Sequence, residues 1–195
     1  MSEEERSKWN ARYREGSHAA AEPSPSLVEI EALLPLRGRA LDVAGGAGRH
    51  ALWLARRGYE VTIVDISDVG LRIAEERARE EGLSISTWRA DLATESVPFG
   101  PWDLILVSHY LDRALFPALV DALSPSGLLV VLHPTKRNLE RHEKPGAPFL
   151  LEEGELLRLA GALSVVKWDE GWLPSGRHEA RLIARKAATT AQSGG

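Results

Sequence analysis

The segment from Arg39 to His50, RALDVAGGAGRH, constrains the fold of this chain more than any other stretch. It joins an apolar strand to a glycine-rich turn through one acidic residue, Asp42. A strand buried on both faces of a parallel sheet reads as a continuous apolar run, and a carboxylate at its end is costly unless it faces backbone amides or a polar ligand. The glycines let the main chain approach a ligand closely. A helix expected from Arg49 to Arg57 begins with unpaired N–H groups, so the segment predicts a ligand-binding strand, turn and helix.

Two classes of ligand use such a turn, and the glycine spacing does not separate them. Gly46, Gly48 and Ala51 satisfy the GxGxxG/A pattern of dinucleotide binding, which leaves a nicotinamide-dependent reductase open. The carboxylate of Asp42 would repel a pyrophosphate and attract a cation. S-adenosylmethionine carries a sulfonium and an ammonium group and no phosphate, so Asp42 favours that cofactor.

Two further aspartates follow predicted strands. Asp65 ends the strand GYEVTIVD about 20 residues after the glycine turn, where an acidic side chain can accept hydrogen bonds from both ribose hydroxyls. Asp91 follows the next strand, SISTW, at the end of RAD. The competing structural interpretation is that all three aspartates only cap the helices that follow them. Carboxylates at three successive strand ends favour a binding site instead.

The strand, acidic residue and glycine turn resemble the first motif of the class I S-adenosylmethionine-dependent methyltransferases, with Ala44 in place of the usual first glycine. The resemblance extends from about Trp9 to Lys186. Two segments, WNARYREG near the start and APFLLEEGEL later, resemble one small-molecule branch of this family, which includes tellurite-resistance-type methyltransferases. The resemblance implies a Rossmann-like, doubly wound α/β sheet of seven strands, mostly parallel with a reversed last strand, and methyl transfer to a small molecule by in-line displacement.

The resemblance also implies a set of site residues. Asp91 would accept the adenine amino group, and Leu92 would donate a backbone N–H to the ring. Ligands of open α/β sheets lie outside the carboxyl ends of the strands, so His109 and Tyr110 are the candidate catalytic residues. We expect S-adenosylmethionine, and its product S-adenosylhomocysteine, to be bound by Trp9, Arg12, Tyr13, Asp42, Ala44, Gly45, Gly46, Arg49, Asp65, Ile66, Ala90, Asp91, Leu92 and Ser108.

Patterning predicts a regular alternation of strands and helices. Strands are expected near 39–43, 60–65, 84–88, 102–107, 127–133, 163–168 and 178–185, and helices near 3–15, 26–34, 49–57, 67–82, 112–123 and 152–161. The link between the last two strands is too short for a helical crossover, so those strands should be antiparallel. We expect one domain over 1–188, whose first 35 residues or so form a helical lid, and a disordered tail over 189–195.

Composition narrows the function classes. A chain of 195 residues with 44% hydrophobic residues suits one domain without a separate substrate domain, and no cysteine is present for a disulfide, a thiolate metal site or a cysteine nucleophile. His109, His133 and Asp112 do not form a local metal-ligand motif, so no metal is expected. The net charge of −4 argues against nucleic-acid binding. Without an apolar run or leader that suggests a membrane or secretion, we expect a cytoplasmic monomer or homodimer. A non-catalytic regulatory protein that binds S-adenosylmethionine is a further alternative.

Overall fold

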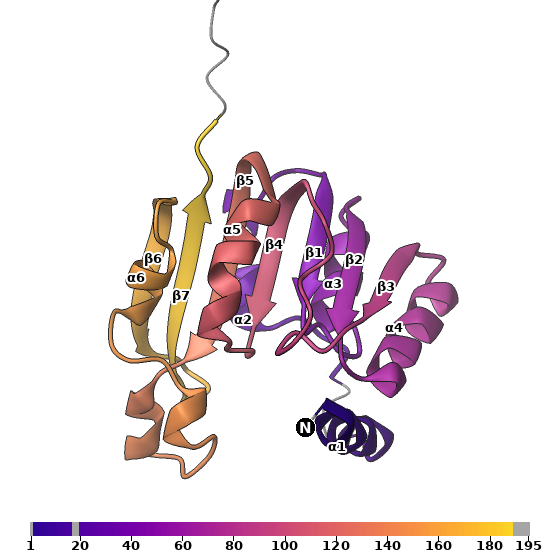
Figure 1. Cartoon of the computed structure of the whole chain (residues 1–195), viewed down its shortest axis with the longest axis horizontal. Coiled ribbons are helices and arrows are strands. Elements are labelled where there is room, and N and C mark those ends of the chain that lie inside the picture. Colours follow the sequence, from indigo (N-terminus) through magenta and orange to yellow (C-terminus); the bar gives the residue numbers. More distant parts are fainter. Residues whose placement is uncertain (1, 17–19, 189–195) are drawn as a thin grey trace, which may run out of the picture.

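The computed structural model describes residues 2–16 and 20–188. Its centre is one seven-stranded sheet with the order β3-β2-β1-β4-β5-β7-β6 (Figure 1). The first five strands along the chain are parallel to one another, and β7 is antiparallel to both β5 and β6. The class I methyltransferase fold and its reversed last strand are therefore confirmed. The strands are β1 (Arg39–Val43), β2 (Glu60–Asp65), β3 (Ile85–Arg89), β4 (Trp102–Ser108), β5 (Leu123–Pro134), β6 (Ser164–Trp172) and β7 (His178–Arg185).

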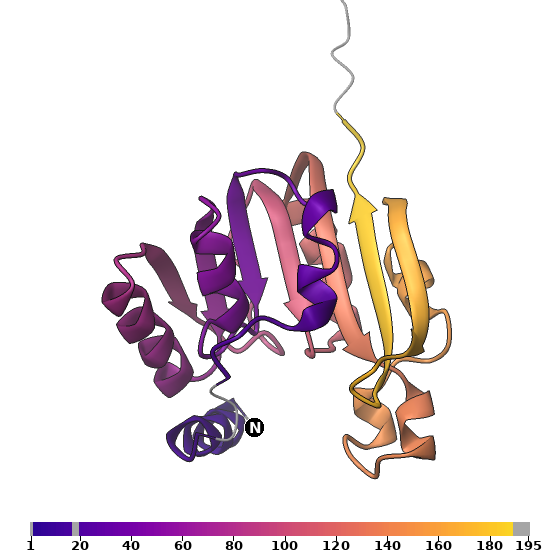
Figure 2. The same cartoon turned by 180° about the vertical axis from the view of Figure 1, so that it is seen from behind.

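Helices cover both faces of this sheet. The α-helices are α1 (Ser2–Arg14), α2 (Pro25–Val28), α3 (Arg49–Ala55), α4 (Asp68–Glu80), α5 (Phe116–Ala122) and α6 (Glu155–Leu159), and the 3-10 turns are η1 (Glu31–Leu33), η2 (Arg113–Leu115), η3 (Lys136–Glu140) and η4 (Ala147–Phe149). Apolar side chains of α5 and α6 pack on one face, and those of α2, α3 and α4 on the other. Figure 2 shows α2 and α3 crossing the second face.

The central strands are apolar on both sides because both faces are covered. In β4, Ile105 and Val107 join the cluster beneath α5 and α6, whereas Leu104 and Leu106 join the cluster beneath α2 and α3. Successive side chains of a strand point to opposite faces, which explains why the run LILV is unbroken. Almost complete burial of these side chains supplies most of the apolar stabilisation that such a sheet needs.

The carboxyl ends of the parallel strands form one edge of the molecule. Because β7 runs the other way, its amino end lies at this same edge, opposite the last residue of β5, Pro134. Helix α1 and the segment of η3 and η4 both extend beyond the sheet here (Figure 1). Residues from distant parts of the sequence therefore meet at this edge.

Several predicted boundaries differ from the structure. The helix expected over 26–34 is a single turn of α2 followed by η1, and the helix expected over 112–123 is divided into η2 and α5, with a proline in the first turn of α5. Strand β5 begins four residues early because Leu123 already pairs with Trp102, before a register shift. No helix within residues 2–16 and 20–188 is long and apolar enough to cross a membrane. The tail expected over 189–195 lies outside the described residues.

Candidate functional site

The glycine-rich turn after β1 brings the backbone close to Asp42. A Cβ built on Gly45 would stand 2.6 Å from the carboxylate of Asp42, so a side chain is excluded there. Gly46 and Gly48 have φ values of 53° and 78°, which glycine adopts without steric cost. Ala44 also has a positive φ of 53°, at the position where the family resemblance expects glycine. Ala44 therefore adopts the left-handed conformation that favours glycine, which strains the backbone locally.

Asp42 is a buried carboxylate, with an exposed fraction of 1%. Neither of its side-chain oxygens has a hydrogen-bond partner among the described residues. Burial raises its pKa to about 7, and the positive charge of Arg49 opposes that rise. A buried carboxylate is stable only when it is paired, hydrogen-bonded or protonated. Asp42 is therefore suited to face a cationic ligand group at the glycine turn.

Asp65 lies at the end of β2 and contacts the same turn. Its carboxylate accepts hydrogen bonds from the backbone N–H groups of Gly46 at 2.9 Å and Ser67 at 2.8 Å. Burial raises its pKa to about 6, and these backbone hydrogen bonds limit the rise. An ionised carboxylate has about four acceptor positions, so two remain for ligand hydroxyls. Ser67, and not Asp65, caps helix α4, because its hydroxyl accepts a hydrogen bond from the N–H of Gly70.

Asp91 follows β3 at the same edge and is partly exposed. One of its oxygens accepts a hydrogen bond from the backbone N–H of Ala93 at 3.1 Å within a turn, and the described residues between it and β4 contain no helix for Asp91 to cap. The neighbouring predicted residues Ala90 and Leu92 are buried, and the N–H of Ala90 donates to the backbone oxygen of Asp65 at 3.1 Å. The aspartates of β1, β2 and β3 therefore stand along three adjacent strand ends. Ile66 is half-buried after Asp65.

Helix α1 is docked on this edge through the residues expected to form a lid. The ring of Tyr13 is buried against Gly46 and Gly70. Trp9 stands 6.2 Å from the Tyr13 ring, and the guanidinium of Arg12 lies 4.8 Å from the centre of Trp9. Burial and the charges of the two buried aspartates raise the pKa of Tyr13 well above its ordinary value. Tyr13 therefore lies close to both Asp42 and Asp65 at the glycine turn.

The docking of α1 also uses a residue that sequence reasoning missed. Asn10 is buried, and its side-chain oxygen accepts hydrogen bonds from the hydroxyl of Ser67 at 2.7 Å and the N–H of Val69 at 3.2 Å. Asn10 and Tyr13 are three residues apart, which puts them on one helical face. That spacing was the only signal in the sequence that could have identified Asn10.

Ser108, which ends β4, and the two residues after it, His109 and Tyr110, point in different directions. The Ser108 hydroxyl is buried and has no hydrogen-bond partner among the residues described. Tyr110 packs against the apolar cluster of α5, and burial raises its pKa to about 12, with Asp112 and Asp91 adding to the rise. His109 has a φ of 58° and points toward α3 and β7. Tyr110 therefore lies near Asp91 and Asp65, whereas His109 lies beside Arg49.

His109 belongs to a polar network that joins three elements. Its Nδ1 is 3.3 Å from a guanidinium nitrogen of Arg49, and its Nε2 is 3.2 Å from a carboxylate oxygen of Glu179. The other oxygen of Glu179 accepts a hydrogen bond from the hydroxyl of Ser26 at 2.6 Å. Neither Glu179 nor Ser26 was predicted as a site residue. Their separation of 153 positions hides the contact from the sequence, although the acidic residue in the apolar strand HEARLIAR was a signal.

His50 and His133, which unlike His109 are buried, hold loops in place. His50 accepts a hydrogen bond from the N–H of Ser24 at 3.3 Å, and burial lowers its pKa to about 3. His133 contacts the backbone oxygen of Phe149 at 2.9 Å through Nε2, and burial lowers its pKa to about 4. In the described part of the chain, no three histidine, aspartate or glutamate side chains are arranged to hold a metal ion.

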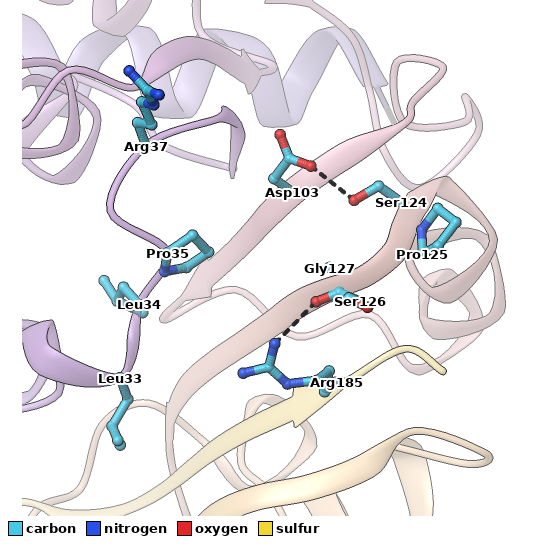
Figure 3. A pocket seen from close by; sticks show the side chains of 10 residues that line it. All are labelled: Leu33, Leu34, Pro35, Arg37, Asp103, Ser124, Pro125, Ser126, Gly127 and Arg185. Atoms are coloured by element: carbon cyan, nitrogen blue, oxygen red, sulfur yellow. Dashed lines mark hydrogen bonds between the residues drawn. The ribbon is translucent and has the colours of Figure 1, made fainter. Parts of the chain in front are cut away.

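A separate pocket lies at the opposite edge of the sheet, where β4 and β5 begin (Figure 3). Its wall includes Asp103, whose carboxylate accepts hydrogen bonds from the N–H of Arg39 and the hydroxyl of Ser124, both at 2.9 Å. Arg185 closes one side by donating to the backbone oxygen of Ser126 at 3.3 Å. These groups satisfy one another, and none of the predicted site residues lines this pocket.

Comparisons with known proteins show that this chain is similar to several methyltransferases. Residues 40–127 match the family model of a methyltransferase domain, which includes the glycine turn and all three aspartates. A ubiquinone biosynthesis O-methyltransferase of Caulobacter is 28% identical over 155 residues, which cover 74% of this chain and 53% of that protein. A tRNA 5-carboxymethoxyuridine methyltransferase of Escherichia coli is 28% identical over 123 residues, covering 59% of this chain and 47% of that protein.

The solved structure of TehB from Haemophilus influenzae has the same fold, with a TM-score of 0.71, 19% identity, and coverage of 91% of this chain and 67% of that one. This chain spans about half the length of the curated relatives it matches. Residues 40–127 are therefore similar to a methyltransferase domain, and the chain as a whole has the fold of class I S-adenosylmethionine-dependent methyltransferases.

Proposed function

We propose that this protein transfers the methyl group of S-adenosylmethionine to a small-molecule acceptor. The observation that carries the proposal is Asp42, a buried carboxylate without a hydrogen-bond partner in the described chain, beside a turn where a side chain at Gly45 would collide with it. A cationic ligand at this turn would stabilise the ionised form of Asp42, whereas a pyrophosphate would be repelled.

The remaining contacts follow from the order of the strand ends. Asp65 would accept the ribose hydroxyls, because its backbone partners leave acceptor positions unused. Asp91 and the backbone N–H of Leu92 would meet the adenine on the next strand. Helix α1 would cover the bound cofactor, with Tyr13 or Arg12 directed toward its carboxylate. We therefore propose that the first 35 residues or so act as a lid of a single domain over 1–188.

The chemistry requires positioning more than side-chain reactivity. The sulfonium is an activated electrophile, and the acceptor must stand in line behind the methyl carbon. Holding two reactants in such a geometry can supply roughly 7 to 11 kcal/mol. We propose that His109 and Tyr110, which follow the end of β4, contact the acceptor. Nucleic-acid binding requires a basic face, and a net charge of −4 does not favour one. We therefore propose a small-molecule acceptor. We also propose a cytoplasmic location.

Calorimetry on the purified full chain tests the cofactor. Titrations with S-adenosylmethionine and S-adenosylhomocysteine should each show binding, and titrations with NADH and NADPH should show none. Asp121→Asn, an exposed change on α5, serves as a control and should bind like the wild type. Tight dinucleotide binding without affinity for S-adenosylmethionine would refute the proposal.

A second experiment tests catalysis. The full chain is incubated with S-adenosylmethionine labelled in the methyl group and with thiols, selenite, tellurite and small phenols in turn. A labelled product shows methyl transfer. Binding of the cofactor without any labelled product would favour a regulatory binding protein instead.

A further inference from the structure

The contact between His109 and Glu179 extends the proposed function to the chemistry of the acceptor. We propose that Glu179 holds His109 in the tautomer with a basic Nδ1, and that the acceptor is a hydroxyl whose proton this nitrogen removes. The inference rests on the proposed methyl transfer. It assigns Glu179 a positioning role through His109 and makes His109 the catalytic residue.

The two partners of the imidazole ring independently assign the same tautomer. Arg49 has only N–H donors, so the ring nitrogen 3.3 Å from it, Nδ1, must be the acceptor. A neutral imidazole then carries its proton on Nε2, which donates to the carboxylate of Glu179 at 3.2 Å. An ionised carboxylate can only accept, which agrees with that direction.

Glu179 is built to remain ionised at this position. Its side chain is 4% exposed. Burial by itself raises its pKa, but the hydrogen bonds from His109 and Ser26 and the charge of Arg181 outweigh that effect and lower the pKa below the ordinary value. A carboxylate that orients a histidine also stabilises the imidazolium formed when the ring takes up a proton. Glu179 is buried in β7, whereas the side chain of His109 is 29% exposed, so a ligand can reach the ring.

The backbone fixes the ring at the edge of the sheet. His109 leaves β4 in a left-handed conformation with a φ of 58°, and its N–H donates to the backbone oxygen of Leu132 at 2.9 Å. A hydroxyl that reaches Nδ1 would take the place of Arg49. The guanidinium of Arg49 is also attracted by Asp42, the carboxylate without a partner in the described chain. Arg49 therefore has a second anionic neighbour toward which it can turn.

The proposed step balances in atoms and charge. The acceptor oxygen forms a bond to the methyl carbon as the bond between that carbon and the sulfur breaks, and the electron pair of the broken bond stays on sulfur. The hydroxyl proton moves to Nδ1 of His109, and the imidazolium later releases it to water. A thiolate or oxyanion that is already ionised would not need this base, so the dyad favours an acceptor that is neutral before it reacts.

Nuclear magnetic resonance of the histidine side chains tests the positioning role without any acceptor. In full-length protein labelled with ¹⁵N in histidine, the wild type should show His109 as the Nε2–H tautomer. In Arg49→Gln the carboxylate of Glu179 alone should keep this tautomer, and in the double variant Arg49→Gln, Glu179→Gln the two tautomers should become mixed, because an amide can donate as well as accept. Glu81→Gln, in a surface ion pair with Arg56, is the matched control and should leave His109 unchanged. An Nδ1–H tautomer in the wild type or in Arg49→Gln, or an unmixed ring in the double variant, would overturn the assignment.

Kinetics with phenol, catechol and benzenethiol as probes test the acceptor class. Benzenethiol is largely ionised in mildly alkaline buffer, whereas the two phenols are not. His109→Gln should lower kcat for the phenols by about a hundredfold, and Glu179→Gln by about tenfold, with little change in KM. Turnover of benzenethiol should change little. Equal losses for all probes would indicate a structural role, and methylation of the thiol without any methylated phenol would overturn the acceptor class.

Calorimetry with S-adenosylhomocysteine on His109→Gln and Glu179→Gln separates this inference from the proposed function. Both should bind like the wild type, because neither residue was assigned to the cofactor. A wild type that fails to bind would refute the methyltransferase proposal itself, whereas normal binding with the wrong tautomer would refute only the role of Glu179.

Discussion

The hydroxyl of Tyr13 lies so close to Gly46 that a Cβ built on Gly46 would overlap it. Gly46 therefore has two reasons to be glycine, its φ of 53° and the close approach of this ring. Helix α1 therefore contacts the glycine turn, whose backbone also faces the proposed cofactor. Any change at this turn should affect both the helix and the ligand.

Gly46→Ala should weaken binding of S-adenosylhomocysteine by at least tenfold, because the new methyl group displaces Tyr13 and strains the turn. Gly82→Ala is a matched control. Gly82 has a similar φ of 67°, but a Cβ there meets nothing within 4 Å. The control should lose roughly 1 kcal/mol of stability from strain and keep its affinity. Calorimetry and thermal melts of both variants test this, and equal affinities would contradict it.

Deletion of the first 20 residues should leave a folded domain, because the clusters of the sheet core contain no residue of α1. Turnover should fall by about a hundredfold, since water then reaches the methyl group and the reactants are less well held. Thermal melts and steady-state rates are the measurements. A truncated protein with full activity, or one that has lost most of its stability, would contradict the lid hypothesis.

Asp65→Ala should weaken binding of S-adenosylmethionine by about 1.5 to 3 kcal/mol, through loss of hydrogen bonds to a charged acceptor. Calorimetry measures the affinity, with Asp121→Ala as the exposed control. Far-ultraviolet circular dichroism shows whether the glycine turn and β2 remain folded, because Asp65 also accepts the N–H of Gly46. Unchanged affinity in a folded variant would refute the ribose assignment.

Asp42 should make the protein less stable as the pH rises from about 4 to about 7. Burial raises its pKa from 3.8 to about 7, so the folded state holds a proton over this interval that the unfolded state has released. Asp65, with a pKa of about 6, adds an effect of the same sign. Urea denaturation at pH 4 and at pH 8 measures the decrease in unfolding free energy over this range. In Asp42→Asn this decrease should be smaller than in the wild type by on the order of 2 to 4 kcal/mol. Parallel curves for wild type and variant would contradict this, and Asp121→Asn should follow the wild type.

The sequence allowed the cofactor half to be predicted more fully than the acceptor half. Asp42, Asp65 and the glycine turn form a local pattern within 24 positions, in which strand, turn and ligand chemistry agree. The strand ranges were close because buried parallel strands are continuous apolar runs. By contrast, the partnership of His109 with Glu179 depends on the pairing of β5 with β7, which no local pattern encodes. The helix predicted over 26–34 was longer than the observed α2, because the apolar spacing continues into the 3-10 turn η1 that follows it.

The reversed strand β7 divides the molecule into two parts that can change separately. The matched methyltransferase domain ends at residue 127 and contains the glycine turn and the three aspartates. Glu179 arrives from beyond it, on the β6–β7 hairpin, whose turn lies at the same edge. Substitutions or insertions in that hairpin can reshape the acceptor side while the cofactor contacts stay intact. The fold thereby allows new substrates to be acquired by altering one hairpin near the end of the chain.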